Sequence, residues 1–156
     1  MKRLVLLCAA FAAFLTLAVP VASAEGPPFT ASGSFAESFV PSNFRTAGAV
    51  TFFDFAGSET LTGTFSGIAV FEGSAVIRPG GQIVGMARET FTGTVAGRPG
   101  TVVWLAPAQI DLVTGSISGS FTVLSGTGDL AGLQGSGTFE GTGGIGTYTG
   151  QFVFAP

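Results

Sequence analysis

Hydrophobic and polar residues alternate with a period of two along most of the chain after residue 28. Over residues 29–39, phenylalanine, alanine, glycine and one glutamate occupy one phase, and the other phase is mainly serine and threonine. Residues two apart in a strand point to the same face. The alternation therefore predicts an antiparallel sheet with a packed inner face and a wetted outer face.

Glycine and phenylalanine recur at a fixed spacing, with one polar residue between them. The copies are Gly33-Ser34-Phe35, Gly63-Thr64-Phe65, Gly119-Ser120-Phe121, Gly137-Thr138-Phe139 and Gly150-Gln151-Phe152, with Phe91-Thr92-Gly93 as a reversed copy. Glycine normally weakens a strand, so its repeated use indicates close approach of a facing ring. Repeated on strand after strand, the pattern predicts a small closed barrel whose rings pack into gaps left by glycines.

The turn signals divide residues 25–156 into strands without a helix. We expect strands near residues 29–40, 47–56, 60–72, 82–96, 101–106, 115–124, 133–141 and 146–154. Gly and Pro predict turns at 78–81 and 96–100. The link 106–114 reads as an irregular flap over one barrel end. The predicted fold is all-β: a single-domain, eight-stranded antiparallel β-barrel.

The first 24 residues have the features of a secretory signal peptide. Lys2-Arg3 precede an apolar run over residues 4–19, and Ala22-Ser23-Ala24 form a small-residue cleavage site. We expect cleavage after Ala24, a secreted or periplasmic product, and one domain over residues 25–156. Lipidation at Cys8 is disfavoured, since too little apolar sequence precedes it.

Composition removes most familiar catalytic machinery. The chain has no histidine, and its one cysteine lies in the expected signal peptide. Neither Ser-His-Asp nor Cys-His catalysis is available, and no acidic residues cluster at metal-ligand spacing, so neither a metal nor a cofactor is expected. Residues 25–156 contain four arginines, no lysine and nine acidic residues. This balance repels phosphate backbones, which predicts no nucleic-acid partner. The Ser/Thr-rich outer face likewise predicts no membrane insertion.

Two segments carry a resemblance to a known group of proteins. They are Ser125-Gly126-Thr127-Gly128-Asp129-Leu130-Ala131-Gly132-Leu133-Gln134-Gly135-Ser136-Gly137-Thr138-Phe139-Glu140-Gly141 and Glu89-Thr90-Phe91-Thr92-Gly93-Thr94-Val95-Ala96-Gly97-Arg98-Pro99-Gly100. Together they resemble an uncharacterised bacterial family of small barrels built like allene oxide cyclase. The glycine-rich segment is also similar to one in plant allene oxide cyclases and dirigent proteins.

The resemblance implies an eight-stranded antiparallel barrel with a cavity open at one end. Relatives of this kind bind apolar ligands or steer cyclisation by shape, and the enzymatic ones often form homodimers or homotrimers. The chain departs from the family at Val102-Val103-Trp104-Leu105-Ala106, where relatives carry more polar residues. That departure argues against a polar active site.

Two glutamates are the candidate catalytic groups. Glu37 and Glu89 fall in phase with inward phenylalanines. A carboxyl group in an apolar cavity has a raised pKa and could act as a general acid. The alternative is that each faces in near the barrel mouth, hydrated or bonded to a turn, with Arg45 or Arg78 as a cross-strand partner.

The candidate ligand-binding residues are aromatic: Phe35, Phe91, Trp104, Phe121 and Tyr148. Trp104 and Tyr148 have apolar bodies and polar tips, which suits a ligand mouth or simple rim packing. The face on which Asp54 lies is left open by periodicity.

Three functions fit these features. The favoured one is a non-catalytic module that binds a small apolar molecule or a partner. The others are a cofactor-free isomerase or cyclase that uses cavity shape and an inward carboxyl, and a structural barrel packed solid.

Overall fold

The computed structural model describes residues 26–155, which form eight strands and no helix. The strands are β1 (Phe29–Ala47), β2 (Val50–Gly63), β3 (Phe65–Ile77), β4 (Gln82–Val95), β5 (Arg98–Asp111), β6 (Ser116–Gly128), β7 (Leu133–Thr142) and β8 (Ile145–Phe154). The expected signal peptide and its cleavage point after Ala24 lie outside the described residues.

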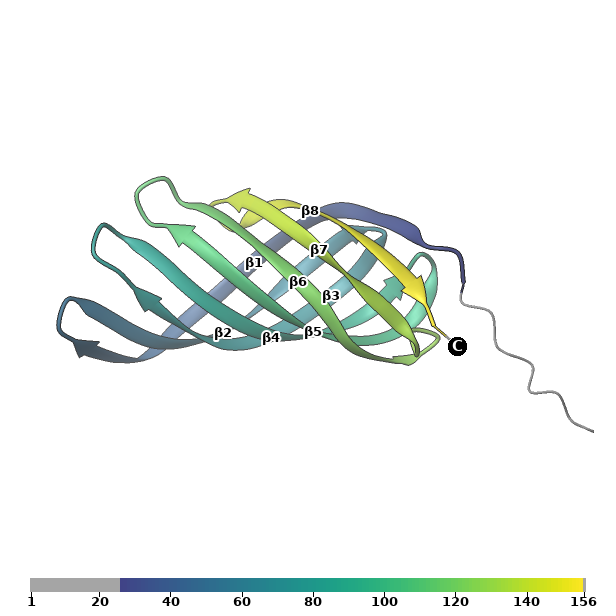
Figure 1. The fold of residues 1–156 in the computed structure, drawn as a ribbon, viewed down its shortest axis with the longest axis horizontal. Coiled ribbons are helices and arrows are strands. Elements are labelled where there is room, and N and C mark those ends of the chain that lie inside the picture. The colour runs from purple at the N-terminus through teal and green to yellow at the C-terminus, as the bar shows by residue number, and fades with distance from the viewer. Residues whose placement is uncertain (1–25, 156) are drawn as a thin grey trace, which may run out of the picture.

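Each strand pairs antiparallel with the next, and β8 pairs with β1 to close the barrel (Figure 1). Closure uses only the first part of β1, over Phe29 to Ala36, whereas β1 pairs with β2 as far as Ala47. The β1–β2 hairpin therefore extends beyond the closed ring. It does so at the end where β3–β4, β5–β6 and β7–β8 also turn, which we call the open end.

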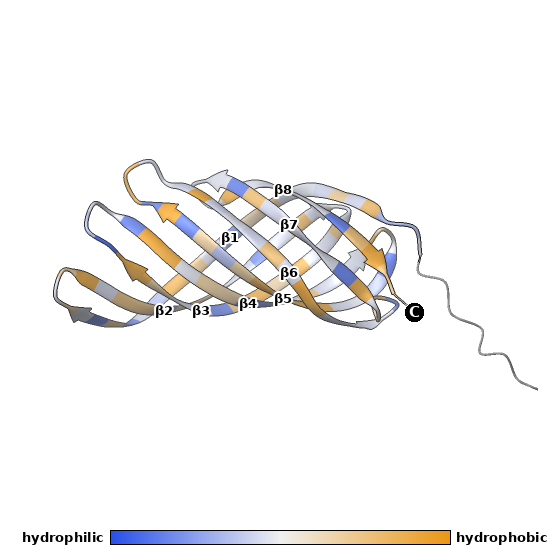
Figure 2. Cartoon of the chain, viewed as in Figure 1, coloured by the Kyte–Doolittle hydropathy of each residue, from blue (hydrophilic) through white to orange (hydrophobic). Residues whose placement is uncertain are grey.

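Hydrophobic and hydrophilic residues follow one another in bands along the strands (Figure 2), and one phase of the alternation is buried inside the barrel. Phe35 on β1, Phe91 on β4 and Phe121 on β6 are buried, and the serines and threonines beside them in sequence are half-buried or exposed. The predicted all-β fold, with eight antiparallel strands in a closed ring, is confirmed.

Aromatic rings pack against glycines on the neighbouring strand. Phe121 pairs directly with Gly137, and a Cβ placed on that glycine would lie 2.5 Å from the ring. Phe35 occupies the same relation to Gly146, whose Cβ would also lie 2.5 Å from the ring. Each ring therefore packs over the glycine that pairs with its own residue on the neighbouring strand.

Both predicted glycine turns are present. Residues 78–81 join β3 to β4, with positive φ angles at Gly80 and Gly81. Residues 96–97 join β4 to β5, and Ala96 and Gly97 both have positive φ (51° and 81°), as the tight reversal of a two-residue hairpin requires.

Several predicted boundaries are wrong. The first strand does not end near residue 40, because β1 continues through an irregularity between Ser42 and Arg45 to Ala47, and β2 begins only at Val50. The turn between the second and third strands lies at Thr64 rather than at residues 57–59, because Gly57 is a slot for the Phe71 ring inside β2 and not a turn glycine. The predicted flap over 106–114 is mostly strand, since β5 continues to Asp111. Pro107 is tolerated there because β5–β6 pairing is interrupted between Leu105 and Ala108.

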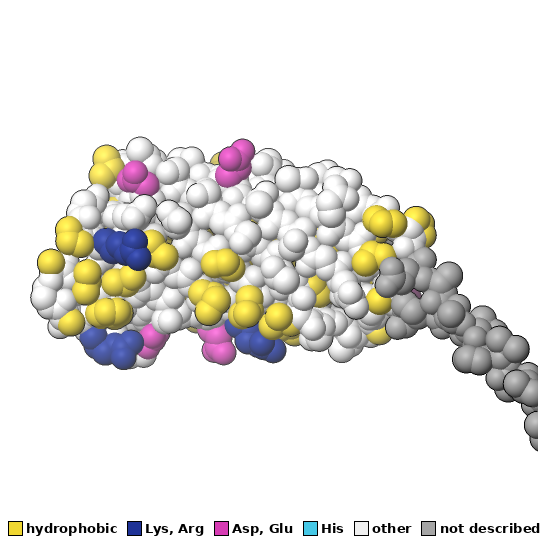
Figure 3. Space-filling model, viewed as in Figure 1, with side chains coloured by type: hydrophobic (Ala, Val, Ile, Leu, Met, Phe, Trp, Pro, Cys, Tyr) yellow, Lys and Arg dark blue, Asp and Glu magenta, His cyan; other side chains and the backbone are white. Residues whose placement is uncertain are grey.

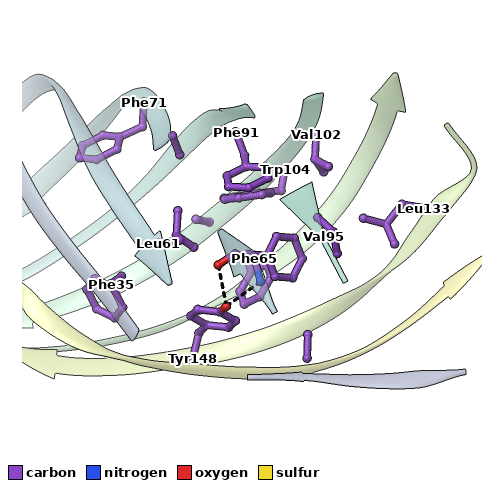
Figure 4. Close-up of a cluster of buried hydrophobic side chains, with 14 of the residues drawn as sticks. Phe35, Leu61, Phe65, Phe71, Phe91, Val95, Val102, Trp104, Leu133 and Tyr148 are labelled. Atoms are coloured by element: carbon purple, nitrogen blue, oxygen red, sulfur yellow. Dashed lines mark hydrogen bonds between the residues drawn. The ribbon is translucent and has the colours of Figure 1, made fainter. Parts of the chain in front are cut away.

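The barrel is packed solid at the end where the described chain begins and finishes. Phe65 lies at its centre, 1% exposed, with five aromatic rings around it at centroid distances of 5.3 to 6.3 Å (Figure 4). Leu130, Val95 and Val102 are fully buried and fill the rest of this end. Side chains alone occupy the interior here.

The outer surface is mostly uncharged and polar, with exposed hydrophobic side chains gathered partly towards the open end (Figure 3). Phe44, Leu112 and Val113, on or beside the open-end turns, are 58%, 55% and 82% exposed. Residues 26–155 contain no helix with the length and hydropathy that a membrane span requires.

Candidate functional site

The open half of the barrel contains a cavity of about 90 Å³. Its walls are mainly aromatic rings and alanines, and it continues up to Trp104 and Tyr148, where the packed half begins. A cavity of this size has room for several water molecules or part of a small ligand. The interior is therefore filled at one end and open at the other.

Three glutamates from different strands converge on this cavity. Glu37 on β1 pairs directly with Glu59 on β2, and Glu89 lies two strands further round on β4. The residue opposite Glu59 on the intervening β3 is Ala69. Its small side chain leaves space for the carboxyl groups of Glu59 and Glu89 to meet in a hydrogen bond.

Trp104 holds Glu89 in place from the other side. The two residues are register partners on β4 and β5, and the Trp104 Nε1–H donates a hydrogen bond of 2.8 Å to Glu89 Oε2. The indole stacks on Phe91 with ring centroids 5.7 Å apart. The packed half of the barrel thus fixes the donor that orients this carboxyl group.

The carboxyl pair has perturbed acidity. Burial raises the pKa of Glu59 from its usual 4.5 to about 9, with repulsion from Glu89, the hydrogen bond to Glu89 and repulsion from Glu37 adding to it. Burial also raises the pKa of Glu89, but the hydrogen bonds from Trp104 and Glu59 counteract this rise. The N–H that Trp104 donates to Glu89 favours the ionised form of that carboxyl group, so the shared proton is held more firmly on Glu59.

Two further groups border the pair. Burial, with repulsion from Glu89, raises the pKa of Glu37. Tyr148 Oη accepts a 2.9 Å hydrogen bond from the Phe65 amide (Figure 4). It also lies 3.0 Å from the Thr62 carbonyl, to which it can donate. Burial raises the pKa of Tyr148, which keeps its hydroxyl neutral and committed to the backbone.

Chemically, the site offers two carboxyl groups that share a proton in a largely apolar cavity. Such a pair can accept a proton at one oxygen and donate one from another, or can bind a group that supplies hydrogen-bond donors. Within residues 26–155, no three acidic side chains are placed closely enough to hold a metal ion.

Comparison with known proteins places the chain in a family. Residues 31–152 match the family described as "Protein of unknown function (DUF3224)". The chain belongs to this family. The match includes all three cavity glutamates together with Trp104 and Tyr148.

A solved structure from the same family has a similar fold. It is the crystal structure of a protein of unknown function from the DUF3224 family of Shewanella oneidensis MR-1, 24% identical to this chain, with a TM-score of 0.71. The similarity covers 83% of this chain and 99% of that one. No curated protein matches the chain. The comparisons thus support the barrel and the family.

In this member of the family, most of the predicted site residues lie together. The candidate acids Glu37 and Glu89 both line the cavity, as do four of the five candidate aromatic residues: Phe35, Trp104, Phe121 and Tyr148. Phe91 is fully buried behind Trp104 and does not line it. Trp104 and Tyr148 are 3% and 5% exposed, so they form the floor of the cavity rather than its rim.

The expected arginine partners lie elsewhere. Arg45 forms a 3.5 Å salt bridge with Asp54 on the outer surface, and this is the one salt bridge within the described residues. Asp54 therefore faces outwards, where it also accepts a hydrogen bond from Asn43. Arg78 is exposed in the β3–β4 turn. Glu89 is stabilised by Trp104 and Glu59 instead.

Sequence reasoning missed Glu59. It lies in phase with Phe55, Gly57 and Leu61, which all line the inside of β2. Interpreting Gly57 as a turn residue interrupted that alternation and left Glu59 outside any predicted strand. Glu59 could have been identified by continuing the period-two pattern through Gly57.

Proposed function

We propose that this protein binds a small, largely apolar molecule in the open half of its barrel. The observation that carries the proposal is an aromatic-lined cavity that stops at a floor of packed rings. Small-molecule sites are typically concave, mainly apolar and furnished with a few convergent polar groups. The cavity has this composition.

The open end supports entry of an apolar molecule. Phe39 lines the cavity and is 39% exposed, and Phe44 stacks on Phe53 with ring centroids 5.6 Å apart at the projecting hairpin. Exposed apolar side chains that continue into an apolar interior are a feature of ligand-binding grooves.

We also propose that the barrel belongs to the allene-oxide-cyclase-like superfamily and acts outside the cytoplasm. The glycine-rich segment over residues 125–141 supports the first statement by resemblance, and the signal-like residues 1–24 support the second. The lack of cysteine after residue 24 is compatible with an oxidising compartment.

Filling the cavity should abolish binding without harming the fold. Ala87 on β4 lines the cavity and is 7% exposed, so Ala87→Leu places extra side-chain volume where the ligand would lie. Trp104 is the single tryptophan of the chain and forms part of the cavity wall, so its fluorescence reports occupancy. We expect titration with cyclohexylmethanol to change this fluorescence in the wild type and not in Ala87→Leu.

The matched control is Ala56→Leu. Ala56 is exposed on the outer face of β2, so the same change adds no volume inside the barrel. Equal binding by Ala87→Leu, Ala56→Leu and the wild type would place any ligand outside the cavity and contradict the proposal.

The carboxyl pair favours a second candidate, a cofactor-free isomerase. Ionised Glu89 would take a proton from a substrate carbon and protonated Glu59 would return one at another atom. Their mutual hydrogen bond would then restore the starting state without a co-reactant. Under this function Glu89→Gln abolishes turnover of an isomerisable apolar ketone while binding persists. If the wild type binds the ketone but does not convert it, the isomerase function is excluded and the non-catalytic binding function is retained.

A further inference from the structure

The polar groups of the cavity are unbalanced between donors and acceptors. Among residues 26–155, the polar side chains that line it are Glu37, Glu59, Glu89, Trp104 and Tyr148. The indole N–H of Trp104 is used by Glu89, and the hydroxyl of Tyr148 is bound to the backbone at Phe65 and Thr62. Both donors that belong to the aromatic residues are therefore occupied.

Unused hydrogen-bonding capacity lies mainly on carboxyl oxygens. Each carboxylate presents about four lone-pair sites when ionised, and the hydrogen bonds from Trp104 and Glu59 use only part of this capacity on Glu89. No arginine or lysine of the described residues lines the cavity. A ligand complementary to this cavity wall must supply hydrogen-bond donors, and a positive charge on it would strengthen its binding.

The aromatic rings favour the same charge. Phe35, Phe55, Phe71 and Phe121 line the cavity around the carboxyl groups. The faces of aromatic rings carry partial negative charge and attract cations, most strongly where water is excluded. The rings also offer apolar contact to a hydrocarbon body. A cation with an apolar body would therefore complement both the phenylalanines and the carboxyl groups of the cavity.

We propose that the ligand is an organic cation: a primary or secondary ammonium group, seated among Glu37, Glu59 and Glu89, on an apolar body that packs against the phenylalanines. This inference rests on the proposed function, since it names the class of molecule that occupies the same cavity. The cation supplies the positive charge that the cavity wall lacks and the donors that its carboxyl oxygens accept.

The test compares three probes of nearly equal shape by Trp104 fluorescence: cyclohexylmethylamine, cyclohexylmethanol and cyclohexanecarboxylate. We expect the amine to bind at least about tenfold more tightly than the alcohol, because one charge-assisted hydrogen bond is worth at least that factor. The carboxylate should bind most weakly. In Glu59→Gln and Glu89→Gln the advantage of the amine should shrink, and alcohol binding should change little.

Calorimetry gives a second readout that does not depend on the indole. The groups facing the ammonium are Glu37 from β1, Glu59 from β2, Glu89 from β4 and Tyr148 from β8. A cation favours the ionised forms of the three carboxyl groups, so amine binding near neutral pH should release protons to the buffer, whereas the Tyr148 hydroxyl keeps its proton. Alcohol binding should release none.

The outcomes separate the two proposals. Amine and alcohol of equal affinity, with no proton release, would overturn the organic-cation inference and leave apolar binding intact. Absence of binding by all three probes would overturn both. The inference would also be overturned if Glu59→Gln weakened amine and alcohol binding equally while a Glu72→Gln control, on the outer face of β3, bound both as the wild type does.

Discussion

The protein should become less stable as the pH rises from about 5 to about 9. Burial raises the pKa of Glu59 from its usual 4.5 to about 9, so the folded state keeps a proton that the unfolded chain releases. Stability is then complete below the unfolded pKa and is lost progressively as the pH approaches the folded pKa. The slope is at most about 1.4 kcal/mol per pH unit for each retained proton.

The chain contains no histidine, so this slope comes from the cavity glutamates: Glu59, whose pKa is raised to about 9, and Glu37 and Glu89, whose pKa values burial also raises. Outside this cluster, few side chains titrate between about pH 5 and pH 9. Glu59→Gln removes the retained proton and keeps an amide that can donate to Glu89. We expect this variant to have a flatter pH profile and, near pH 8, to be more stable than the wild type by roughly 2–4 kcal/mol.

Urea unfolding at several pH values measures the profile, with Glu72→Gln as the matched control. Glu72 is exposed on β3, and its substitution should leave the slope unchanged. A wild-type stability that is constant or rises over this range would show that Glu59 is ionised in the folded protein. It would also remove the physical basis for the proton-sharing pair.

Phe65→Ala should be among the most destabilising single substitutions in the chain. Phe65 is 1% exposed and meets the rings of Phe91, Trp104, Phe121, Tyr148 and Phe152 in the packed half. Its removal leaves a void between strands held by continuous pairing, which cannot collapse readily. Such truncations cost about 3–5 kcal/mol, and denaturant unfolding measures the loss.

The control is Phe44→Ala at the open end. Phe44 is 58% exposed and has its aromatic contact with Phe53, so its loss should cost about 1 kcal/mol or less. Similar costs for the two substitutions would contradict the division of the interior into a packed half and an open half.

The alternation of residue types made the barrel predictable. Phase alone placed Phe35, Phe91 and Phe121 inside and identified Glu37 and Glu89 as inward acids, since a strand has only two faces. Strand number followed from the turns. Boundaries were misjudged after residue 40, at Gly57 and at Pro107, because the same residue types serve as turn formers and as tolerated strand residues.

The content of the site was less predictable, because it depends on register between strands. The meeting of Glu59 with Glu89 requires that Ala69 stand opposite Glu59 on β3. The bond from Trp104 to Glu89 likewise requires their pairing across β4 and β5. Periodicity fixes the face of each residue and leaves its neighbours round the barrel unspecified.

The same register explains why the cavity lies in one half only. At the packed end, the rings around Phe65 meet one another across the whole interior. Towards the open end, Ala75, Ala87 and Ala106 take the inward positions and leave space. Small inward residues on adjacent strands are therefore what create a site rather than a solid core.

Native mass spectrometry of the purified protein determines whether the open half of the barrel binds a small molecule. The spectrum should show a one-to-one complex, either with a co-purifying ligand or after addition of cyclohexylmethylamine. The added mass should disappear on denaturation and be absent from Ala87→Leu. A ligand-free mass with every apolar alcohol and amine added would contradict ligand binding in the open half and indicate that the cavity is occupied only by water.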